Sequence, residues 1–166
     1  SDGIRLHYEV IGRSSATPVL MIQGLGADKH GWDMQRLPLA MQYRVIALDN
    51  RGAGRSDKPF GTYSLEQMAD DAIAVLDEVG VEKAHIVGAS MGGAITQIIG
   101  LKYPERVMSL TLACTACRNH PWRRELLAQN GIATQISDHL RALEGLGGLD
   151  ALGGPKTDNM FHAGWA

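Results

Sequence analysis

The residues best suited to chemistry stand at 85–93, where the chain reads HIVGASMGG. Gly88-Ala89-Ser90-Met91-Gly92 matches G-x-S-x-G, the pattern in which a serine hydroxyl is exposed on a sharp turn between a strand and a helix. Such a turn is strained, so the residues around the serine must be small. Gly88, Gly92, Gly93 and Ala94 meet that need. We therefore predict that Ser90 is a nucleophile, the alternative being a purely structural serine.

A second glycine-rich turn, Gln23-Gly24-Leu25-Gly26, follows another apolar run. Two backbone amides that converge on one point can hold the oxyanion of a tetrahedral intermediate. The amides of Leu25 and Met91 are the candidates for this oxyanion hole. The alternative is an ordinary tight turn between a strand and a loop.

A third turn reads DNRGAGRS over residues 49–56. It lacks the G-x-x-x-x-G-K-[ST] spacing of a phosphate-binding loop, and no acidic residue follows at the distance that a ribose-binding motif requires. We interpret Asp49 and Arg51 as polar residues that fix the turn.

Each of these turns must be positioned by regular structure. Short, almost uninterrupted apolar runs precede the turns, and such runs are typical of strands that are covered on both faces of a sheet. The expected strands are 18–24, 44–50, 85–90 and 107–113, with an alternating strand at 4–11 that joins antiparallel at one side. Helices are expected at 31–42, 64–80 and 91–103. Ser64 and Gln67 fit a capping box, and Gly80 supplies a helix stop. The pattern predicts an α/β fold with a mostly parallel sheet and flanking helices.

The chain divides near residue 115. Residues 1–115 form the predicted core, and Asp2-Gly3 has the form of a hairpin turn, which suggests that a first strand has been left off. Residues 116–166 carry no strand signal and are predicted to be a helical segment and a loose tail, with the start of a cap as one interpretation.

Composition excludes several classes of function. The formal net charge is −2 over 166 residues with no basic run, so neither nucleic acid nor a membrane surface is an expected partner. Two cysteines are too few for a disulfide framework, which favours a cytoplasmic location. A small-molecule substrate is expected, and no motif implies a metal or an organic cofactor.

Taken in order, Q-G-L-G, D-N-R-G-A-G-R-S and G-A-S-M-G-G resemble the α/β-hydrolase family, and its esterase, lactonase and haloperoxidase-like branch in particular. The resemblance covers residues 1–115. It implies that Ser90 is the nucleophile after the fifth strand of the family sheet, with Leu25 and Met91 as oxyanion amides. Gln23 departs from the family, which usually has histidine at that position.

The family triad also needs an acid and a histidine after two further strands. Chain order allows Asp138, Asp150 or Asp158 with His162, but none of them follows a strand-like run. We interpret the chain as a truncated α/β-hydrolase fold. The expected function is that of a serine hydrolase that acts on an ester, lactone or thioester through an acyl-enzyme on Ser90, with its activity impaired.

The sequence also allows two other functions. Cys114, Cys117 and His120, with His139 as a conceivable fourth ligand, could form a metal-binding module. Alternatively, the chain could be a non-catalytic remnant that self-associates through an open edge of strand 107–113. Among the remaining histidines, His85 is predicted to be structural, whereas His7 and His30 are predicted to be exposed.

Overall fold

The computed structural model describes residues 3–115. The predicted helical segment and tail at 116–166 therefore lie outside the described residues. Within residues 3–115, five strands form one sheet in the order β1-β3-β2-β4-β5. Their bounds are β1 Tyr8–Ile11, β2 Pro18–Ile22, β3 Arg44–Leu48, β4 Ala84–Ala89 and β5 Val107–Ala113. Among these described strands the β1–β3 pair alone is antiparallel, so the predicted mostly parallel sheet with an antiparallel strand at one side is confirmed.

The first strand is shorter than predicted. It begins at Tyr8 rather than at residue 4, because residues 5–7 bond to the loop after β3. The Asp49 amide donates to the His7 carbonyl at 2.8 Å, and the Asp57 amide donates to the Arg5 carbonyl at 2.9 Å. The segment before β1 thus runs alongside the 49–57 loop instead of extending the regular ladder.

The helices follow the predicted ranges with small differences at their ends. They are α1 Asp33–Leu39, α2 Leu65–Glu78 and α3 Met91–Lys102, with short 3₁₀ turns at Lys29–Trp32 and Pro104–Arg106. Ser64 and Gln67 form the predicted capping box on α2. Gly80 follows that helix with φ +67°, the left-handed conformation that glycine adopts most readily.

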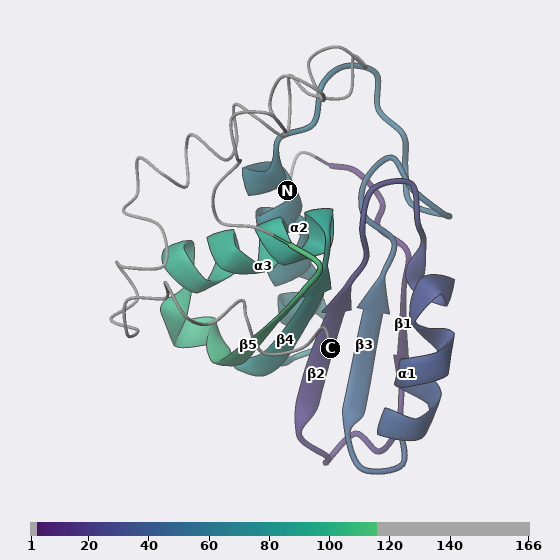
Figure 1. Cartoon of the computed structure of the whole chain (residues 1–166), viewed down its shortest axis with the longest axis vertical. Helices are drawn as coiled ribbons and strands as arrows, with labels where there is room; N and C mark the ends of the chain where they lie inside the picture. The colour runs from purple at the N-terminus through teal and green to yellow at the C-terminus, as the bar shows by residue number, and fades with distance from the viewer. Residues whose placement is uncertain (1–2, 116–166) are drawn as a thin grey trace, which may run out of the picture.

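Alternation along the strands divides the core between two faces of the sheet. Leu20 and Ile22 of β2 pack with α2 and α3, whereas Val19 and Met21 pack with Trp32 on the α1 side. Figure 1 shows the resulting layers, with α1 on one side of the sheet and α2 and α3 on the other. The carboxyl ends of β2, β3 and β4 share one edge, and the three glycine-rich turns therefore meet there.

The outermost parallel strand differs from its prediction. β5 was expected to be covered on both faces, yet Met108 is 49% exposed and no position of β5 is fully buried. The physical reason is its place in the sheet, because within residues 3–115 it pairs with β4 alone.

Candidate active site

Ser90 occupies a strained turn between β4 and α3. Its φ is +53° and its ψ is −117°, a backbone conformation that side-chain-bearing residues rarely adopt. The Ser90 amide donates to the Ala113 carbonyl at 2.9 Å, and the Ser90 carbonyl accepts from the Gly93 amide at 3.0 Å. These bonds hold the turn while the residue itself stays exposed. The sharp turn that the G-x-S-x-G pattern predicts is therefore present.

The glycines around Ser90 are required by space. A Cβ atom on Gly92 would lie 2.7 Å from the Ile22 carbonyl carbon and 2.8 Å from the Gln23 carbonyl oxygen. These are backbone atoms at the end of β2, and they cannot move aside cheaply. A Cβ atom on Gly88 would collide with the Gly92 carbonyl oxygen. The start of α3 thus packs directly against the end of β2, which only glycine permits.

The second glycine turn lies against the serine. We call residues 23–26 the oxyanion loop. A Cβ atom on Gly24 would lie 3.2 Å from Ser90 Cβ and 3.7 Å from Ser90 Oγ, so the loop and the hydroxyl are neighbours. Met91 is the first residue of α3, where backbone amides lack a partner within the helix. Within residues 3–115, the hydrogen bonds of loops and turns include none donated by the Leu25 or Met91 amide.

The peptide unit between Gln23 and Gly24 is held at both ends. Gln23 Oε1 accepts a hydrogen bond from the Gly24 amide at 2.8 Å. Asn50 Nδ2 donates to the Gln23 carbonyl at 3.0 Å, and Asn50 is 2% exposed. Sequence reasoning missed Asn50. The available signal was its position at the end of the predicted strand 44–50, at the sheet edge where the other turns meet.

Asp49 joins two loops of this edge, in keeping with the turn-fixing role predicted for it. Its buried carboxylate accepts from the Lys29 amide at 2.8 Å and from the Arg55 amide at 2.9 Å. Burial by itself would raise the pKa of Asp49, but these amide hydrogen bonds, together with the nearby Lys29 ammonium, outweigh burial and hold the pKa below its ordinary value. The loop after β2 and the loop after β3 are therefore tied through one ionised group.

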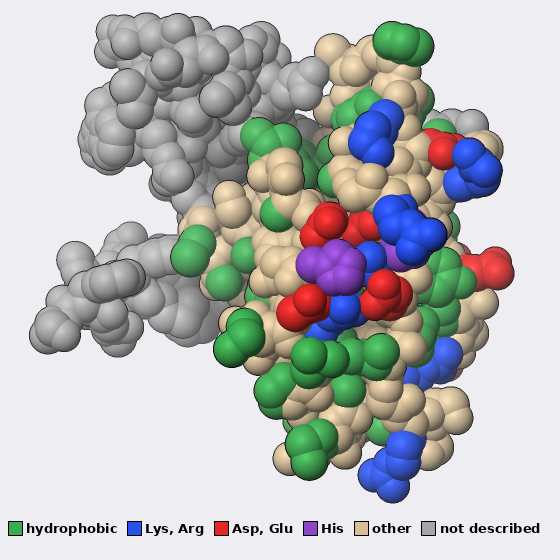
Figure 2. Space-filling view, turned by 90° about the vertical axis from the view of Figure 1, so that its right-hand side faces the viewer, with side chains coloured by type: hydrophobic (Ala, Val, Ile, Leu, Met, Phe, Trp, Pro, Cys, Tyr) green, Lys and Arg blue, Asp and Glu red, His purple; other side chains and the backbone are tan. Residues whose placement is uncertain are grey.

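A charged cluster anchors the far end of the loop after β2 (Figure 2). Lys29 is only 1% exposed, and its Nζ lies 3.1 Å from Glu9 Oε1 and 3.2 Å from His30 Nε2. Arg36 NH1 donates to Glu9 Oε2 at 2.7 Å, which is the main reason that the pKa of Glu9 lies below its ordinary value. A buried ammonium needs such partners. The cluster joins the 3₁₀ turn, α1 and β1.

The histidine predictions had mixed outcomes. The His30 side chain is 55% exposed, as predicted. His7 was predicted to be exposed, but its side chain is only 23% exposed and its Nδ1 lies 3.2 Å from Asp49 Oδ2. The cause is the 49–57 loop, which bonds to residues 5–7. His85 Nδ1 lies 2.7 Å from Ser109 Oγ across the β4–β5 pair, an arrangement that fits the predicted structural role.

Arg51 ties the turn after β3 to a helix through a buried ion pair. Its guanidinium makes two hydrogen bonds to the Asp71 carboxylate, at 2.6 and 2.8 Å. Both side chains are almost fully buried, at 4% and 1% exposure. Because Asp71 belongs to α2, this pair ties the third glycine turn to the helix layer and agrees with the structural role predicted for Arg51.

Several predicted site residues lie outside the described residues. They are the triad candidates Asp138, Asp150, Asp158 and His162, and the metal-ligand candidates Cys117, His120 and His139. Within residues 3–115, no group of three or more His, Cys, Asp or Glu side chains is placed to hold a metal ion. Cys114 was expected at the end of a buried strand, but it is an exposed free cysteine that follows β5, a strand without a fully buried position that pairs with β4 alone within residues 3–115.

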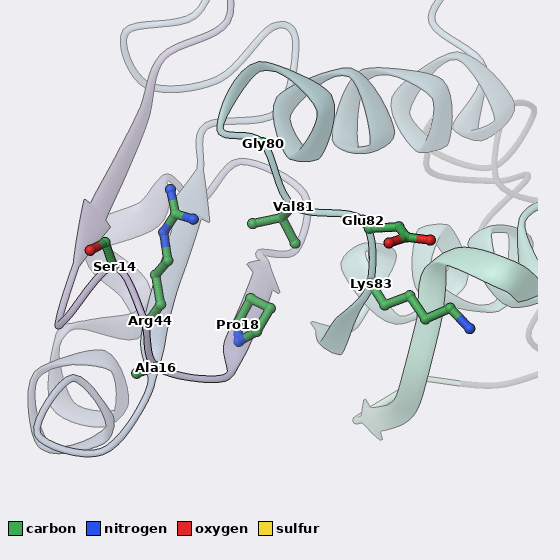
Figure 3. Close-up of a pocket in the computed structure, with 8 residues that line it drawn as sticks. All are labelled: Ser14, Ala16, Pro18, Arg44, Gly80, Val81, Glu82 and Lys83. Atoms are coloured by element: carbon green, nitrogen blue, oxygen red, sulfur yellow. The ribbon is translucent and has the colours of Figure 1, made fainter.

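One pocket of about 330 Å³ lies elsewhere (Figure 3). Its lining includes Pro18 and Arg44, the first residues of β2 and β3. Ser90 follows the carboxyl end of β4, so the pocket opens at the opposite edge of the sheet and takes no part in the candidate active site.

Among the helices of residues 3–115, none has the length and apolar character needed to cross a membrane.

Comparison with known proteins agrees with this geometry. The family profile of the α/β-hydrolase fold matches residues 17–139, which is most of the chain. The chain therefore belongs to the α/β-hydrolase family. The matched region contains the oxyanion loop, the turn after β3 and Ser90.

Individual relatives are similar over the same region. The chain is 34% identical over 146 residues to 3-oxoadipate enol-lactonase 1 of Acinetobacter baylyi. The aligned region covers 84% of this chain and 54% of the lactonase. A hydrolase from Pseudomonas aeruginosa PA01 superposes with a TM-score of 0.72 at 33% identity, covering 83% of this chain and 53% of the other. The enol-lactonase of Burkholderia xenovorans LB400 gives a TM-score of 0.69 at 29% identity, covering 82% and 55%. The chain spans about half the length of these relatives.

Proposed function

We propose that the protein is a serine hydrolase whose Ser90 forms an acyl-enzyme with a carboxylic ester, a lactone or a thioester. The observation that carries the proposal is the strained turn at Ser90, with φ +53° and the oxyanion loop against its side chain. A fold gains nothing in stability from placing a serine in such a conformation. It does gain a hydroxyl that stands exposed beside amides able to receive negative charge.

The proposed reaction has two halves. Ser90 Oγ attacks the carbonyl carbon, its proton passes to a general base, and the carbonyl oxygen becomes an oxyanion that the Leu25 and Met91 amides stabilise. The tetrahedral intermediate then collapses, and the C–O or C–S bond to the leaving group breaks as that group takes up a proton. Water repeats the attack on the acyl-enzyme and releases the acid. The positive end of α3 also favours the negative charge.

The general base is the unassigned part of this proposal. The histidine and acid candidates that chain order allows lie outside the described residues, and none of them follows a strand-like run. A serine without a positioned base is a poor nucleophile. We therefore expect slow acylation by this chain.

The substrate class rests on the relatives. Two of those compared are named as enol-lactonases, and a lactone is a cyclic ester that the Ser90 chemistry would open. A small-molecule substrate also fits the absence of a basic run in the sequence. We place the reaction in a reducing cytoplasm, because the sequence holds only two cysteines.

A burst experiment tests the proposal. With p-nitrophenyl acetate in excess over the chain, an initial release of up to one p-nitrophenol per chain is expected as Ser90 becomes acetylated, followed by slower turnover, and Ser90→Ala is expected to abolish the initial phase. Gln67→Ala provides a control, because Gln67 is an exposed capping residue of α2 that is hydrogen-bonded to Ser64. An equal burst from Ser90→Ala would refute the nucleophile.

A further inference from the structure

We propose that Asn50 and Gln23 are positioning residues that together orient the oxyanion loop, an assignment that rests on the proposed function. Neither side chain needs to touch the substrate. They act on one peptide unit, the one between Gln23 and Gly24, which directly precedes the peptide unit that carries the Leu25 amide.

A peptide unit is planar, so fixing its two polar ends fixes its orientation. The carbonyl of this unit accepts from Asn50 Nδ2 at 3.0 Å. The amide of the same unit donates to Gln23 Oε1 at 2.8 Å. With this plane held, the direction of the next amide depends only on the backbone angles of Gly24. A Cβ atom on Gly24 would lie 3.2 Å from Ser90 Cβ, so this glycine packs closely against the serine.

Burying the Asn50 side chain costs stability, and the hydrogen bond to the Gln23 carbonyl is the gain that we set against this cost. Asn50 is 2% exposed, and within the described residues its Oδ1 has no hydrogen-bond partner. A buried acceptor without a partner destabilises a fold. Turning the amide over would not help, since it would place Oδ1 against the Gln23 carbonyl oxygen. Only the orientation with Nδ2 on that carbonyl makes a bond.

The same carbonyl is also the atom on which the serine turn packs. A Cβ atom on Gly92 would lie 2.8 Å from the Gln23 carbonyl oxygen. Asn50 therefore holds an atom that contacts the first turn of α3, where the second oxyanion amide, that of Met91, is located. One buried amide side chain links the oxyanion loop, the loop after β3 and the serine turn.

Gln23 stands at the position where the family usually has histidine. Its flexible side chain can fold back to hydrogen-bond the next backbone amide, and we infer that it shapes the loop in place of the histidine ring. Its Oε1 turns back to the amide of the next residue, and its Nε2 fills the space beside Gly31. A Cβ atom on Gly31 would lie 3.0 Å from Gln23 Cδ, so the side chain is packed in place. Loss of the acceptor, rather than loss of bulk, should release the loop.

The test uses the whole chain and substitutions that separate hydrogen bonding from packing. Gln23→Met keeps the length and removes the acceptor, whereas Gln23→Glu keeps the acceptor. Asn50→Asp keeps the shape and removes the donor. The matched control is Gln97→Met, because Gln97 is a glutamine of α3 that also bonds a backbone carbonyl, that of Gly93, outside the oxyanion loop. Gln97 is the more buried of the two glutamines, so the control overstates rather than understates the cost of losing an amide side chain.

Two readouts are measured. In single-turnover acylation with p-nitrophenyl acetate, Gln23→Met and Asn50→Asp should be about 10- to 100-fold slower, comparable to a misplaced catalytic group. The half-saturating concentration should change by less than about threefold, since binding is left intact. Gln23→Glu is compared by amide exchange alone, because its negative charge beside the oxyanion would slow acylation for a separate reason. Its carboxylate still accepts from the Gly24 amide, so Gly24 exchange should stay within about threefold of the parent chain. By NMR, hydrogen exchange of the Gly24 amide should accelerate at least about tenfold in Gln23→Met and stay unchanged in Gln97→Met.

The outcomes separate this inference from the proposed function. If Gln23→Met matches Gln97→Met in acylation rate and in Gly24 exchange, the positioning role is wrong while the nucleophile stands. If Ser90→Ala keeps the burst, or if the parent chain forms no acyl-enzyme, the proposed function is wrong. Gly24 exchange then still decides whether Gln23 holds the loop.

Discussion

Replacing Ser90 tests the strain in its turn independently of any catalysis. The residue has φ +53° and ψ −117°, and the cost of such a backbone conformation for a residue with a Cβ atom is about 1–3 kcal/mol. Ser90→Ala keeps this strain, because alanine also has a Cβ atom. Ser90→Gly removes it. Glycine loses more backbone entropy on folding, which offsets about 0.4–1 kcal/mol of the gain.

The two terms leave a net difference of about 1 kcal/mol in favour of glycine. We expect Ser90→Gly to have the larger free energy of unfolding by that amount, measured by urea denaturation of both variants under the same conditions. Differences in side-chain contacts should contribute little to the difference in unfolding free energy, because Ser90 is exposed and neither variant carries a hydroxyl. The pair therefore isolates the backbone angle.

Two controls calibrate the difference. Gly80 has φ +67° with nothing within 4 Å of its Cβ position, so Gly80→Ala should lower the free energy of unfolding by about 1 kcal/mol. At exposed Glu78, which ends α2, alanine should instead exceed glycine by about 0.5–1 kcal/mol. If both controls change the free energy of unfolding as expected and Ser90→Ala is as stable as Ser90→Gly, the turn is not strained and our interpretation of the Ser90 backbone is refuted.

Three further predictions concern the rest of the described structure. Asp71→Asn should lower the free energy of unfolding by about 3–5 kcal/mol, because it removes the buried carboxylate that accepts two hydrogen bonds from the Arg51 guanidinium; a loss below about 1 kcal/mol in urea denaturation would contradict this. The pKa of Asp49 lies below its ordinary value in the folded chain, so its contribution to stability is present above the ordinary carboxyl pKa and is lost as the pH falls through the folded value. Urea denaturation between about pH 2.5 and 6 should therefore show a weaker acid dependence for Asp49→Asn, and an identical slope would count against the ionised Asp49. Thr111→Lys on the exposed face of β5 should reduce self-association at micromolar concentration in sedimentation velocity, whereas a parent chain that is already monomeric would remove the basis for this prediction.

Local signals explain why much of the fold could be predicted. The strands and α2 were found because apolar runs and the Ser64–Gln67 capping box are properties of neighbouring residues. The strained serine turn was found for the same reason, since the small residues that it needs stand within a few positions of Ser90. These requirements are written in short stretches of the chain.

What escaped prediction depends on contacts between distant segments. The hydrogen bond from Asn50 to the Gln23 carbonyl joins residues 27 positions apart, and no local pattern indicates it. Lysine is rarely buried, so the 1% exposure of Lys29 becomes understandable only once Glu9 on β1 is placed beside it. The partial burial of His7 arises in the same way, from the loop that follows β3.

The most direct test of the proposed nucleophile is covalent labelling with a fluorophosphonate, followed by peptide mass spectrometry. The nucleophile displaces fluoride from phosphorus and keeps the phosphonyl group, so the labelled residue is identified by its mass. We predict one adduct per chain, on the peptide that contains Ser90, and none on Ser90→Ala. An adduct on another residue, or the same extent of labelling in Ser90→Ala, would contradict the account.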